Sequence, residues 1–487
     1  MNLSSRGSRR SLIRNLLAGL CLGAMLGSLA ACGGAVGGGN APRRLVIAAA
    51  GGTSALPTLR MYQCLTSGLR ALLYFDDGSV GDFTSRVVWS TSNPGVVKVS
   101  NGDIPGPTSG FYIPGALIPD GTGNAIITAD YFGITGQAAV SVGAVNSIEL
   151  KAVINGNYVP LWRINTNHTA PTNSFTMGQG TSVQVAVTAV LDNVETDVTN
   201  FATLGFKDTN TPVATMVQQN GAANLVAGAL GGPVVPVASF SPCSITTITD
   251  PTKIVNMSVS PVQSIAMQPE FPPPDPTQPV SVSNPLPELF VGNSERFKVI
   301  GSLASGDSQD VSAQSTLTVQ NSSSAAQFGG ASGINNLLFA TAPGQAVLKA
   351  TFNQNGAALT APFISTIVNT GVMQTFTVCW TDIFTTVQSC PANQSPATVQ
   401  AGTLTPLQFH AIGNYGLDAN NQPIMQDVTR STTWTSGATS VATISNGGNI
   451  AGQALGISQG TVTISVANAS AVNIPATTTG LTVSPPP

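Results

Sequence analysis

Apolar residues at every second position recur along the chain, and most of these stretches begin at a glycine. Gly123, Gly344 and Gly460 are each followed by apolar residues two, four and six positions later. A period of two is typical of a β-strand that buries one face. A looser stretch with Val255, Met257 and Val259 has the same alternation without the glycine. The pattern therefore predicts a strand that closes each of four similar units.

A second signature combines an acid, a β-branched or aromatic residue, a Thr or Ser, and a large apolar residue seven positions after the acid. The acid and the apolar residue are Asp82 and Trp89, Asp310 and Leu317, Asp427 and Trp434, and, two positions late, Asp197 and Phe206. Internal repeats decide the architecture of such a chain. We expect Trp89 and Trp434 to fill the space between two sheets, with Leu317 and Phe206 in the same place.

The length of the repeated region agrees with four β-sandwiches. Residues 44–487 divide into four units of 111 residues, close to the roughly 100 residues of an immunoglobulin-like domain. The sequence predicts an all-β chain of about four tandem immunoglobulin-like β-sandwiches. The expected domains span 44–144, 145–260, 261–370 (with a proline-rich loop from Pro269 to Pro287) and 371–487. Short linkers predict a string of beads with restricted hinges.

Two segments resemble a known family. Residues 88–94 (VWSTSNP) with Val97 and Val99, and residues 434–436 (WTS) with Val441 and Ile444, are similar to the bacterial immunoglobulin-like domain, group 2. That family occurs in invasin- and intimin-like adhesins and other surface proteins. The resemblance implies a β-sandwich fold and a place in the cell envelope; it does not imply a ligand.

The first residues carry the features of an export signal. Residues 1–14 hold four arginines and no acid, and an apolar run extends from Leu16 to Ala31. A basic region, an apolar region and small residues at the end predict a secretory signal peptide over 1–31. Leu29-Ala30-Ala31-Cys32 resembles the lipobox of bacterial lipoproteins, and an ordinary signal peptide with a chance cysteine is the alternative.

The lipobox resemblance implies that Cys32 becomes the first residue, carries a diacylglycerol and receives a third acyl chain. Two or more chains anchor a protein stably. Residues 32–43 would then form a glycine-rich tether, and Gly33 favours the outer membrane over the inner one. Whether the chain faces the periplasm or the cell surface stays open.

Composition and charge exclude several classes of protein. Charged residues make up only 8% of the chain, hydrophobic residues 42%, and the chain has 51 Gly and 33 Pro. Such a chain is neither disordered nor helical by composition. The formal net charge of −3 becomes −7 when the four arginines of the signal leave. No basic patch remains for nucleic acid.

The cysteines of the mature chain fit an oxidising compartment. Cys379 and Cys390 lie eleven apart in the fourth unit, and we expect a disulfide between them. Cys64 and Cys243 are each alone in their unit; they either pair across the first joint or stay free and buried. No CxxC motif or nearby histidine accompanies them, so we expect no metal site and no cofactor.

Candidate chemistry is sparse. His168 and His410 have no catalytic partner nearby in the sequence, and the alternation around His410 predicts the outer face of a strand. Gly456-Ile457-Ser458-Gln459-Gly460 matches a nucleophile elbow as a string, but no Asp, Glu or His follows it. The elbow needs such partners, so we interpret the segment as a turn.

Further motifs have a simple structural interpretation beside a functional one. Asp76-Asp77-Gly78 and Gly306-Asp307 resemble fragments of calcium loops and are better explained as turns. Asn-Gly at Asn101 and Asn446 predicts hairpin turns. Tyr158, Trp162 and Arg163 would form either an exposed surface on which a sugar stacks or a minor core contact.

Three functions remain for a chain of this kind. The first is a non-enzymatic, lipid-anchored envelope protein that presents its domains for adhesion or for binding a protein or a glycan. The second is a structural subunit of an envelope complex. The third, an accessory carbohydrate- or peptidoglycan-active lipoprotein, would need paired carboxylates in a catalytic domain, and the repeats leave no room for one.

Overall fold

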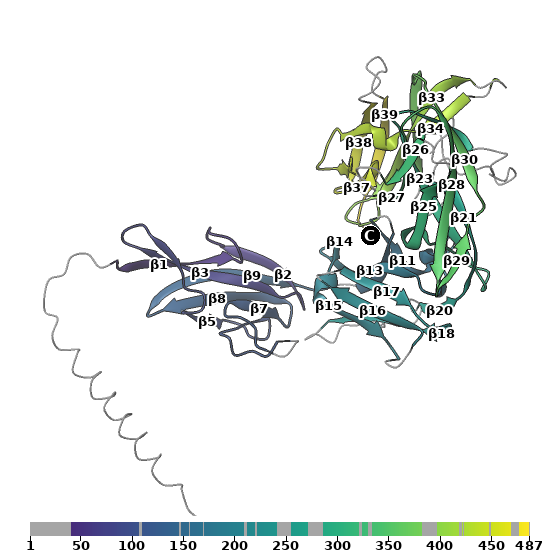
Figure 1. The fold of residues 1–487 in the computed structure, drawn as a ribbon. Coiled ribbons are helices and arrows are strands. Elements are labelled where there is room, and N and C mark those ends of the chain that lie inside the picture. Colours follow the sequence, from purple (N-terminus) through teal and green to yellow (C-terminus); the bar gives the residue numbers. More distant parts are fainter. Residues whose placement is uncertain are drawn as a thin grey trace, which may run out of the picture.

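The structure is a computed structural model and shows an all-β chain of four tandem immunoglobulin-like sandwiches (Figure 1). It describes residues 40–106, 110–145, 148–154, 156–168, 170–208, 212–219, 222–240, 255–270, 286–320, 324–329, 334–381, 397–417, 421, 423–447, 450–468 and 477–486. The predicted signal peptide, Cys32 and most of the tether lie outside the described residues, as do Cys243, Cys390 and residues 271–285 of the proline-rich loop. No described helix has the length and apolar character that crossing a bilayer requires.

The first domain shows the arrangement that the others repeat. One sheet has the order β1-β3-β7-β6 with β4 beside β3, and the other has the order β2-β9-β8-β5. The last strand, β9, pairs in parallel with β2, the second half of the split first strand. The strands are β1 (Pro42–Ala49), β2 (Thr58–Tyr62), β3 (Ser67–Phe75), β4 (Val80–Asp82), β5 (Val88–Thr91), β6 (Val97–Val99), β7 (Ala116–Pro119), β8 (Gly123–Tyr131) and β9 (Ile134–Gly143).

Domains 3 and 4 have the same strand order. In domain 3 the sheets are β21-β23-β27-β26 and β22-β30-β28-β25; in domain 4 they are β31-β33-β37-β36 and β32-β39-β38-β35. The elements of domain 3 are β21 (Val262–Pro269), β22 (Leu286–Phe290), β23 (Ser294–Leu303), β24 (Ser308–Asp310), η4 (Ser312–Gln314), β25 (Ser315–Val319), β26 (Ala326–Gly329), β27 (Ile334–Ala340), β28 (Gly344–Gln354), β29 (Ala357–Thr360) and β30 (Ile364–Asn369). Those of domain 4 are β31 (Thr375–Thr381), β32 (Ala397–Gln400), β33 (Leu407–Leu417), β34 (Pro423–Asp427), η7 (Thr429–Ser431), β35 (Thr432–Ser436), β36 (Ala442–Ile444), β37 (Gln453–Gly456), β38 (Gly460–Asn468) and β39 (Thr477–Ser484).

Domain 2 departs from this order in its second layer. One sheet is β11-β10-β13-β17-β16, whereas the other layer is divided into β12-β20-β18 and β15-β19. The elements are β10 (Ile148–Ile154), β11 (Asn157–Pro160), η1 (Leu161–Ile164), β12 (Ser174–Gly178), β13 (Ser182–Leu191), β14 (Val194–Asp197), η2 (Thr199–Phe201), β15 (Ala202–Phe206), β16 (Ala214–Gln219), β17 (Ala222–Ala227), β18 (Gly231–Val234), β19 (Pro236–Phe240) and β20 (Asn256–Ser260).

The alternating stretch around Met257 is a strand, as predicted. It is not, however, the equivalent of the strands that begin at Gly123, Gly344 and Gly460. The strands that begin at Gly123, Gly344 and Gly460 pair with the strand carrying Trp89, Leu317 or Trp434. In domain 2 that partner is β19, whereas β20 pairs in parallel with β12 as the last strand. Both strands alternate because both bury one face, so the pattern alone could not separate them.

Each domain has a main apolar core of its own, and the predicted residues lie in it. Trp89 is 3% exposed and Trp434 is 1% exposed, between the two sheets of their domains. Leu317 is buried in the core of domain 3, and Phe206 packs against the core of domain 2 while half-buried. The expectation for Trp89 and Trp434 is therefore confirmed.

The repeated acid and hydroxyl have a common structural role. In all four domains the Thr or Ser nitrogen donates to the Asp carboxylate, at 2.9 Å in domain 1 and 2.8 Å in domain 4. The Thr or Ser oxygen then accepts a hydrogen bond from a backbone nitrogen of the long strand β3, β13, β23 or β33, at 2.8 to 3.0 Å. The signature therefore ties the turn to the central strand, and in domains 1 and 4 the same turn receives the indole N–H of the tryptophan.

The predicted role of Asn101 and Asn446 as hairpin turns is wrong. Neither asparagine has the positive φ that a two-residue hairpin of this type requires. Instead the Asn101 side chain accepts a hydrogen bond from the Trp89 nitrogen at 2.7 Å and donates to the Trp89 oxygen at 3.0 Å. Asn446 makes the same pair of bonds to Trp434. Each asparagine side chain therefore bonds to both backbone groups of the tryptophan, as the backbone of a neighbouring strand would.

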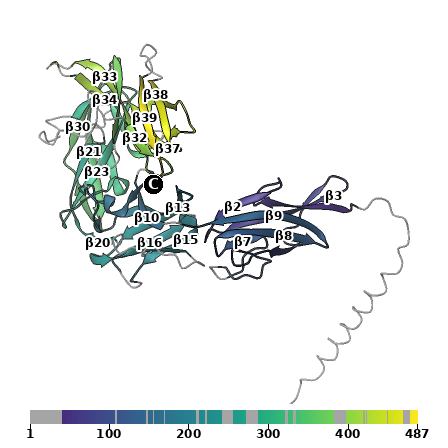
Figure 2. The ribbon, with the colours of Figure 1, turned by 180° about the vertical axis from the view of Figure 1, so that it is seen from behind.

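The four domains do not form an extended string. Domain 1 points away from a group made by domains 2, 3 and 4, as two opposite views show (Figures 1 and 2). Domain 4 returns to touch domain 2, where the Glu195 nitrogen donates to the Gly402 oxygen at 2.5 Å. The expectation of a string of beads therefore fails for the last three domains, because polar contacts join domains that are not neighbours in the sequence.

Candidate functional site: the interdomain junctions

Domains 2, 3 and 4 are joined by two junctions with the same construction. The residue before the signature acid is Gln309 in domain 3 and Gln426 in domain 4, and these side chains are 1% and 3% exposed. The Gln309 oxygen accepts a hydrogen bond from the Gly178 nitrogen at 2.7 Å, at the end of β12. The Gln426 oxygen accepts one from the Phe290 nitrogen at 3.1 Å, at the end of β22.

The two junctions also agree in a second partner, which lies three residues after the first one in the preceding domain. Gln309 also bonds to the Thr181 hydroxyl, with the amide nitrogen at 3.2 Å, and Gln426 accepts from the Asn293 amide at 2.9 Å. Strands β12 and β22 hold the same place in their domains, each pairing in parallel with the last strand. A buried glutamine beside the signature therefore docks each domain on the one before it.

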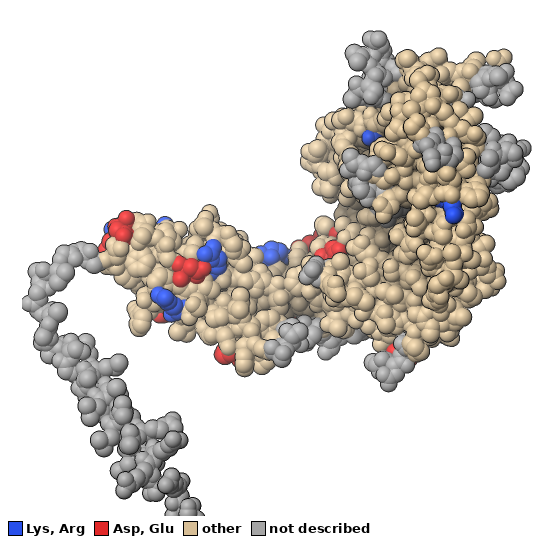
Figure 3. Space-filling model, viewed as in Figure 1, with Lys and Arg blue, Asp and Glu red and all other residues tan. Residues whose placement is uncertain are grey.

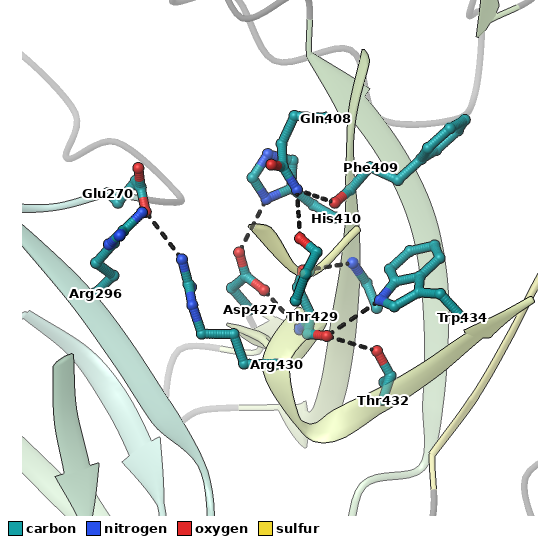
Figure 4. Close-up of polar contacts among 12 residues, drawn as sticks. Glu270, Arg296, Gln408, Phe409, His410, Asp427, Thr429, Arg430, Thr432 and Trp434 are labelled. Carbon is teal, nitrogen blue, oxygen red and sulfur yellow. Dashed lines mark hydrogen bonds and ion pairs between the residues drawn. The ribbon is translucent and has the colours of Figure 1, made fainter. Parts of the chain in front are cut away.

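The junction between domains 3 and 4 adds an ion cluster, of which Figure 4 shows Glu270, Arg296 and Arg430. The Glu270 carboxylate, which follows β21, receives Arg296 at 3.4 Å and Lys298 at 3.3 Å from its own domain, and Arg430 at 3.2 Å from domain 4. The side chains of Glu270 and Arg430 are both 19% exposed, and that of Arg296 is 4% exposed. One carboxylate thus contacts three bases, of which Lys298 is the most exposed, at 32%.

The electrostatics of this junction follow from that arrangement. Burial alone would raise the pKa of Glu270, but the positive charges of Lys298, Arg296 and Arg430 together lower it well below its ordinary value. Burial likewise opposes ionisation of Asp427, whereas the hydrogen bond and charge of His410, together with Arg430 and Thr429, lower its pKa. Both carboxylates are therefore held ionised at neutral pH.

His410 lies on the outer face of its own sandwich, as predicted, and is nevertheless buried. Its exposed fraction is 8%, and its Nδ1 lies 3.0 Å from Asp427 Oδ2. The alternation predicts the outer face correctly, and in the structure the imidazole lies there beside Asp427 of β34, the strand that pairs with β33.

An aromatic stack completes the same junction. The rings of Phe290 and Tyr415 lie 3.8 Å apart and nearly parallel, at 7°. Phe290 is 4% exposed. A Cβ added at Gly371, in the linker between the two domains, would lie 2.4 Å from the Phe290 ring, so the linker must approach the ring without a side chain.

The junction between domains 2 and 3 is polar and continuous. The Thr166 nitrogen donates to the Ser308 oxygen at 2.8 Å, and Gln314 donates to the Ser182 oxygen at 2.9 Å. His168 Nε2 lies 3.0 Å from Asp307. The segment Gly306-Asp307 is a turn, as interpreted, and it also takes part in a domain contact.

The contact between domains 2 and 4 closes the group. Glu195 accepts a hydrogen bond from the Leu404 nitrogen at 3.0 Å and forms an ion pair with Lys151. Gly402 has a φ of +70° and is so close to domain 2 that an added Cβ would lie 2.7 Å from the Asn193 oxygen. A further close approach joins Gly156 of domain 2 and Ile450 of domain 4.

Two described hydroxyl groups that resemble nucleophiles are engaged in other hydrogen bonds. Thr172 Oγ1, His168 and Asp307 lie in the order of a nucleophile, a base and an orienting acid, but the Thr172 hydroxyl is 3.5 Å from His168 and donates to the Ser174 oxygen at 2.7 Å. Its proton is therefore directed away from the imidazole. Ser458 donates to the Ser440 oxygen in a turn before β38.

Metal binding finds no support in the same part of the chain. No group of three His, Cys, Asp or Glu residues among the described residues has the geometry to hold an ion. Asp77 accepts a hydrogen bond from the Ser79 nitrogen at 2.9 Å, and Gly78 has a φ of +83°. The segment from Asp76 to Gly78 is therefore a turn, as interpreted.

The residues considered for sugar binding have partners inside the molecule. Trp162 is 7% exposed, so its ring offers no open face, and the alternative of an exposed stacking surface is wrong for this residue. The Arg163 guanidinium lies 4.1 Å from the Trp162 ring centroid. The Tyr158 hydroxyl donates to Asp197 at 2.7 Å, and burial, with this bond, raises its pKa.

The described cysteines are buried at informative places. Cys64 is 3% exposed, packs against the core of domain 2 although it belongs to domain 1, and is disulfide-bonded. Cys379 is fully buried and is also disulfide-bonded. Because Cys243 and Cys390 lie outside the described residues, the pairings with them stay predictions.

The junction residues were not predicted, although one signal was available. A polar Gln precedes the acid in the third and fourth copies of the signature, whereas Thr196 holds that place in the second copy and Gly81 in the first. A long amide at a repeated position next to a buried turn needs a partner. The sequence could have suggested a contact, and only the fold supplies the neighbouring strand.

Comparison with known proteins gives likeness in fold alone. No family model and no curated protein matches the chain. Among solved structures, domains 4–9 of the surface layer protein SbsC match with 14% identity and a TM-score of 0.22, covering 91% of this chain and 66% of that one. The insect immune protein hemolin matches with 10% identity and a TM-score of 0.20, covering 91% and 100%.

The bacterial integrin-binding protein invasin also matches, with 11% identity and a TM-score of 0.16, covering 91% of this chain and 79% of that one. This chain spans 66% of the surface layer fragment. These values are too low to transfer a function or a domain arrangement.

Proposed function

We propose that the chain is a non-enzymatic, lipid-anchored protein of the bacterial cell envelope that holds a fixed three-domain head away from the membrane for adhesion or binding. The anchor would be Cys32, followed by the tether over 33–43, with the outer membrane as the expected site. Domain 1 would be the stalk, and domains 2, 3 and 4 the head.

The observation that carries this proposal is the closure of the head. Glu195 and Gly402 join domains 2 and 4, and the two glutamine junctions join each of these domains to domain 3. Buried polar contacts have strict geometry, so they fix orientation. A protein that serves only as a flexible spacer would gain nothing from three such contacts.

The anchor is tested by expressing the full chain in a bacterial host and determining the mass of its amino-terminal peptide. A diacylglycerol and an acyl chain on Cys32 are expected, and the Cys32→Ser variant should be released from the membrane fraction. An unmodified Cys32 in a processed chain would contradict the anchor.

The head is tested by small-angle scattering of the mature chain. Glu195→Ala removes the acceptor of the Leu404 nitrogen, and the radius of gyration is expected to increase as domain 4 leaves domain 2. Glu149→Ala is the matched control, because Glu149 lies 3.7 Å from the same Lys151, is half exposed and bonds to none of the described residues of domain 4. Equal scattering of the three proteins would contradict the closed head.

The binding role is separated from the structural role by two further measurements. Binding of the purified mature chain to an array of glycans and matrix proteins would support the adhesin. Recovery of fixed envelope partners from solubilised membranes, with no binding on the array, would support the structural subunit of an envelope complex.

A further inference from the structure

The turn between β8 and β9 holds a phenylalanine that neither packing nor backbone geometry explains. Phe132 is 92% exposed and has a φ of +49°. The left-handed region is unfavourable for a bulky side chain. The corresponding turn of domain 3 has Asn355 at φ +50° followed by a glycine, and asparagine tolerates this conformation. The fold therefore asks for a small polar residue where domain 1 has an aromatic one.

Phe132 is the outermost member of a group of rings. Its ring meets Tyr131 edge-on with centroids 4.9 Å apart, Tyr131 meets Phe83 at 4.9 Å, and Phe83 lies 6.0 Å from Phe75. The guanidinium of Arg86 lies 5.4 Å from the Phe83 centroid. Aromatic rings beside an arginine are typical of the interface between a bilayer and water.

The group lies at the end of domain 1 where the described chain begins. Pro42 pairs with Phe75 at the start of β1, whereas Tyr62 and Gly143 pair at the opposite end, next to domain 2. Figure 1 shows the same orientation of domain 1, in which β1 starts at the end far from domain 2. The proposed glycine-rich tether has ten residues from Gly33 to Pro42 and as a flexible chain would span only about 15–20 Å, so this end would face an anchoring membrane.

Three bases (Arg43, Arg44 and Arg86) and three acids (Asp76, Asp77 and Asp130) lie around the rings, so their charges balance. Arg43 forms an ion pair with Asp76 at 2.6 Å, Asp77 accepts from Asn40, and Asp130 accepts from the Gly133 nitrogen. This surface therefore has no excess of positive charge to attract anionic headgroups. Any affinity for a bilayer must come from the exposed aromatic ring.

We propose that the tip of the β8–β9 turn, led by Phe132, inserts into the headgroup region of the bilayer that anchors the chain and so sets the angle of the stalk. The proposal rests on the proposed anchor for the position of domain 1, and its occupant is a lipid surface. Burial of one Phe side chain is worth about 1.5–3 kcal/mol, which is roughly ten- to a hundredfold in an equilibrium constant. A single ring is too weak to recruit the chain alone and is sufficient to orient one that is already tethered.

The test uses Phe132→Trp in the mature chain. The protein is studied in its native lipidated form and, separately, with an amino-terminal histidine tag on vesicles of phosphatidylethanolamine, phosphatidylglycerol and a nickel-chelating lipid. Trp89, Trp162 and Trp434 are buried and Trp380 is half-buried, so the emission of the unsubstituted chain on the same vesicles is subtracted as background. The added emission is expected to shift to the blue and to be quenched by lipids brominated on their acyl chains. Val372→Trp is the control, because Val372 is 84% exposed and lies between domains 3 and 4.

The outcomes separate this proposal from the anchor. Quenching at position 132 on nickel vesicles supports the insertion even if Cys32 proves unmodified. A lipidated chain without quenching at position 132, or equal quenching at 132 and 372, overturns it. Phe132→Asn provides a second check: it should leave domain 1 as stable as before or more stable, and a marked loss of stability would show that the ring serves folding instead.

Discussion

The first joint of the chain differs from the two that follow it. At the later joints Gln309 and Gln426 are buried and bond to the end of the split strand in the preceding domain. At the first joint the corresponding residue of domain 2 is Thr196, which is half-buried and whose hydroxyl donates to the Val194 oxygen of its own domain. The polar contact there consists instead of Arg60 and Asp192, each about half exposed. One residue in a repeated signature thus decides whether a domain docks by a buried bond.

The distribution of charge follows the same division. On the face shown in Figure 3, acidic and basic residues gather over domain 1 and the first joint, whereas the rest of the surface is largely uncharged. The head keeps an ion cluster inside its last junction. An exposed pair is weakened by salt and contributes little to stability, whereas a buried cluster resists screening. The stalk is therefore expected to respond to salt and the head is not.

The largest effect is expected for Glu270→Gln. The substitution leaves Arg296, Lys298 and Arg430 without their carboxylate, and removing one partner of a buried ion group costs about 3–5 kcal/mol. Hydrogen exchange of peptides that cover β22, β23 and η7 should become faster, with the protection of β12 unchanged.

Asp120→Asn is the matched control for that substitution. Asp120 pairs with Lys98 at 2.8 Å, but both side chains are 49% exposed. An exposed pair is worth about 0–1 kcal/mol. A loss of protection as large as that of Glu270→Gln would remove the distinction between exposed and buried pairs.

A smaller effect is expected for Gln309→Ala. Its loss leaves the buried Gly178 nitrogen without an acceptor, which costs about 1–3 kcal/mol. Exchange at Gly178 should accelerate, and the radius of gyration should increase as domain 3 moves. Thr196→Ala at the equivalent position of domain 2 should change neither quantity, and an equal effect of both substitutions would show that the repeated glutamine is not the docking residue.

Acid is expected to weaken the last junction. The pKa of Asp427 is lowered in the folded chain, so its contribution is present above the ordinary Asp value of about 4 and is lost as the pH falls below it. Asp427→Asn should be less stable than the parent at pH 7, and the difference should shrink to near zero in acid. Urea unfolding at several pH values, monitored by hydrogen exchange of peptides that cover β35 and η7, measures it; a constant difference would contradict the ionised state.

Much of the fold could be predicted from local patterns. Period-two alternation and the repeated acid and hydroxyl predict strands and turns because both depend on residues close in sequence. The tryptophans were placed correctly, since a large ring in such a repeat has no other space to occupy. Asn101 and Asn446 were misread because Asn-Gly favours a turn locally, whereas here the amide is needed to bond the backbone beside each tryptophan.

The junctions could not be predicted in the same way. Gln309 meets Gly178, and Glu195 meets Leu404, across 131 and 209 residues. Polar residues of this kind are expected at the surface, and only the relative position of two folded domains buries them. For His410 the alternation predicted the outer face of the strand correctly, but not that the imidazole is buried beside Asp427, seventeen residues away.

The smallest effect is expected for Asp192→Asn at the first joint. Asp192 accepts from Arg60 at 2.8 Å and from the Tyr62 hydroxyl at 2.6 Å, and Asn tolerates its positive φ and keeps the second bond. Cys64, Leu65 and the Tyr62 ring still pack against domain 2. The stability should not change measurably, while the angular range of domain 1 in scattering data should widen slightly. High salt should widen the angular range of domain 1 in the parent as much as the substitution does, and should not change it in the variant. A salt effect of equal size in both proteins would show that the pair of Arg60 and Asp192 does not restrain the stalk.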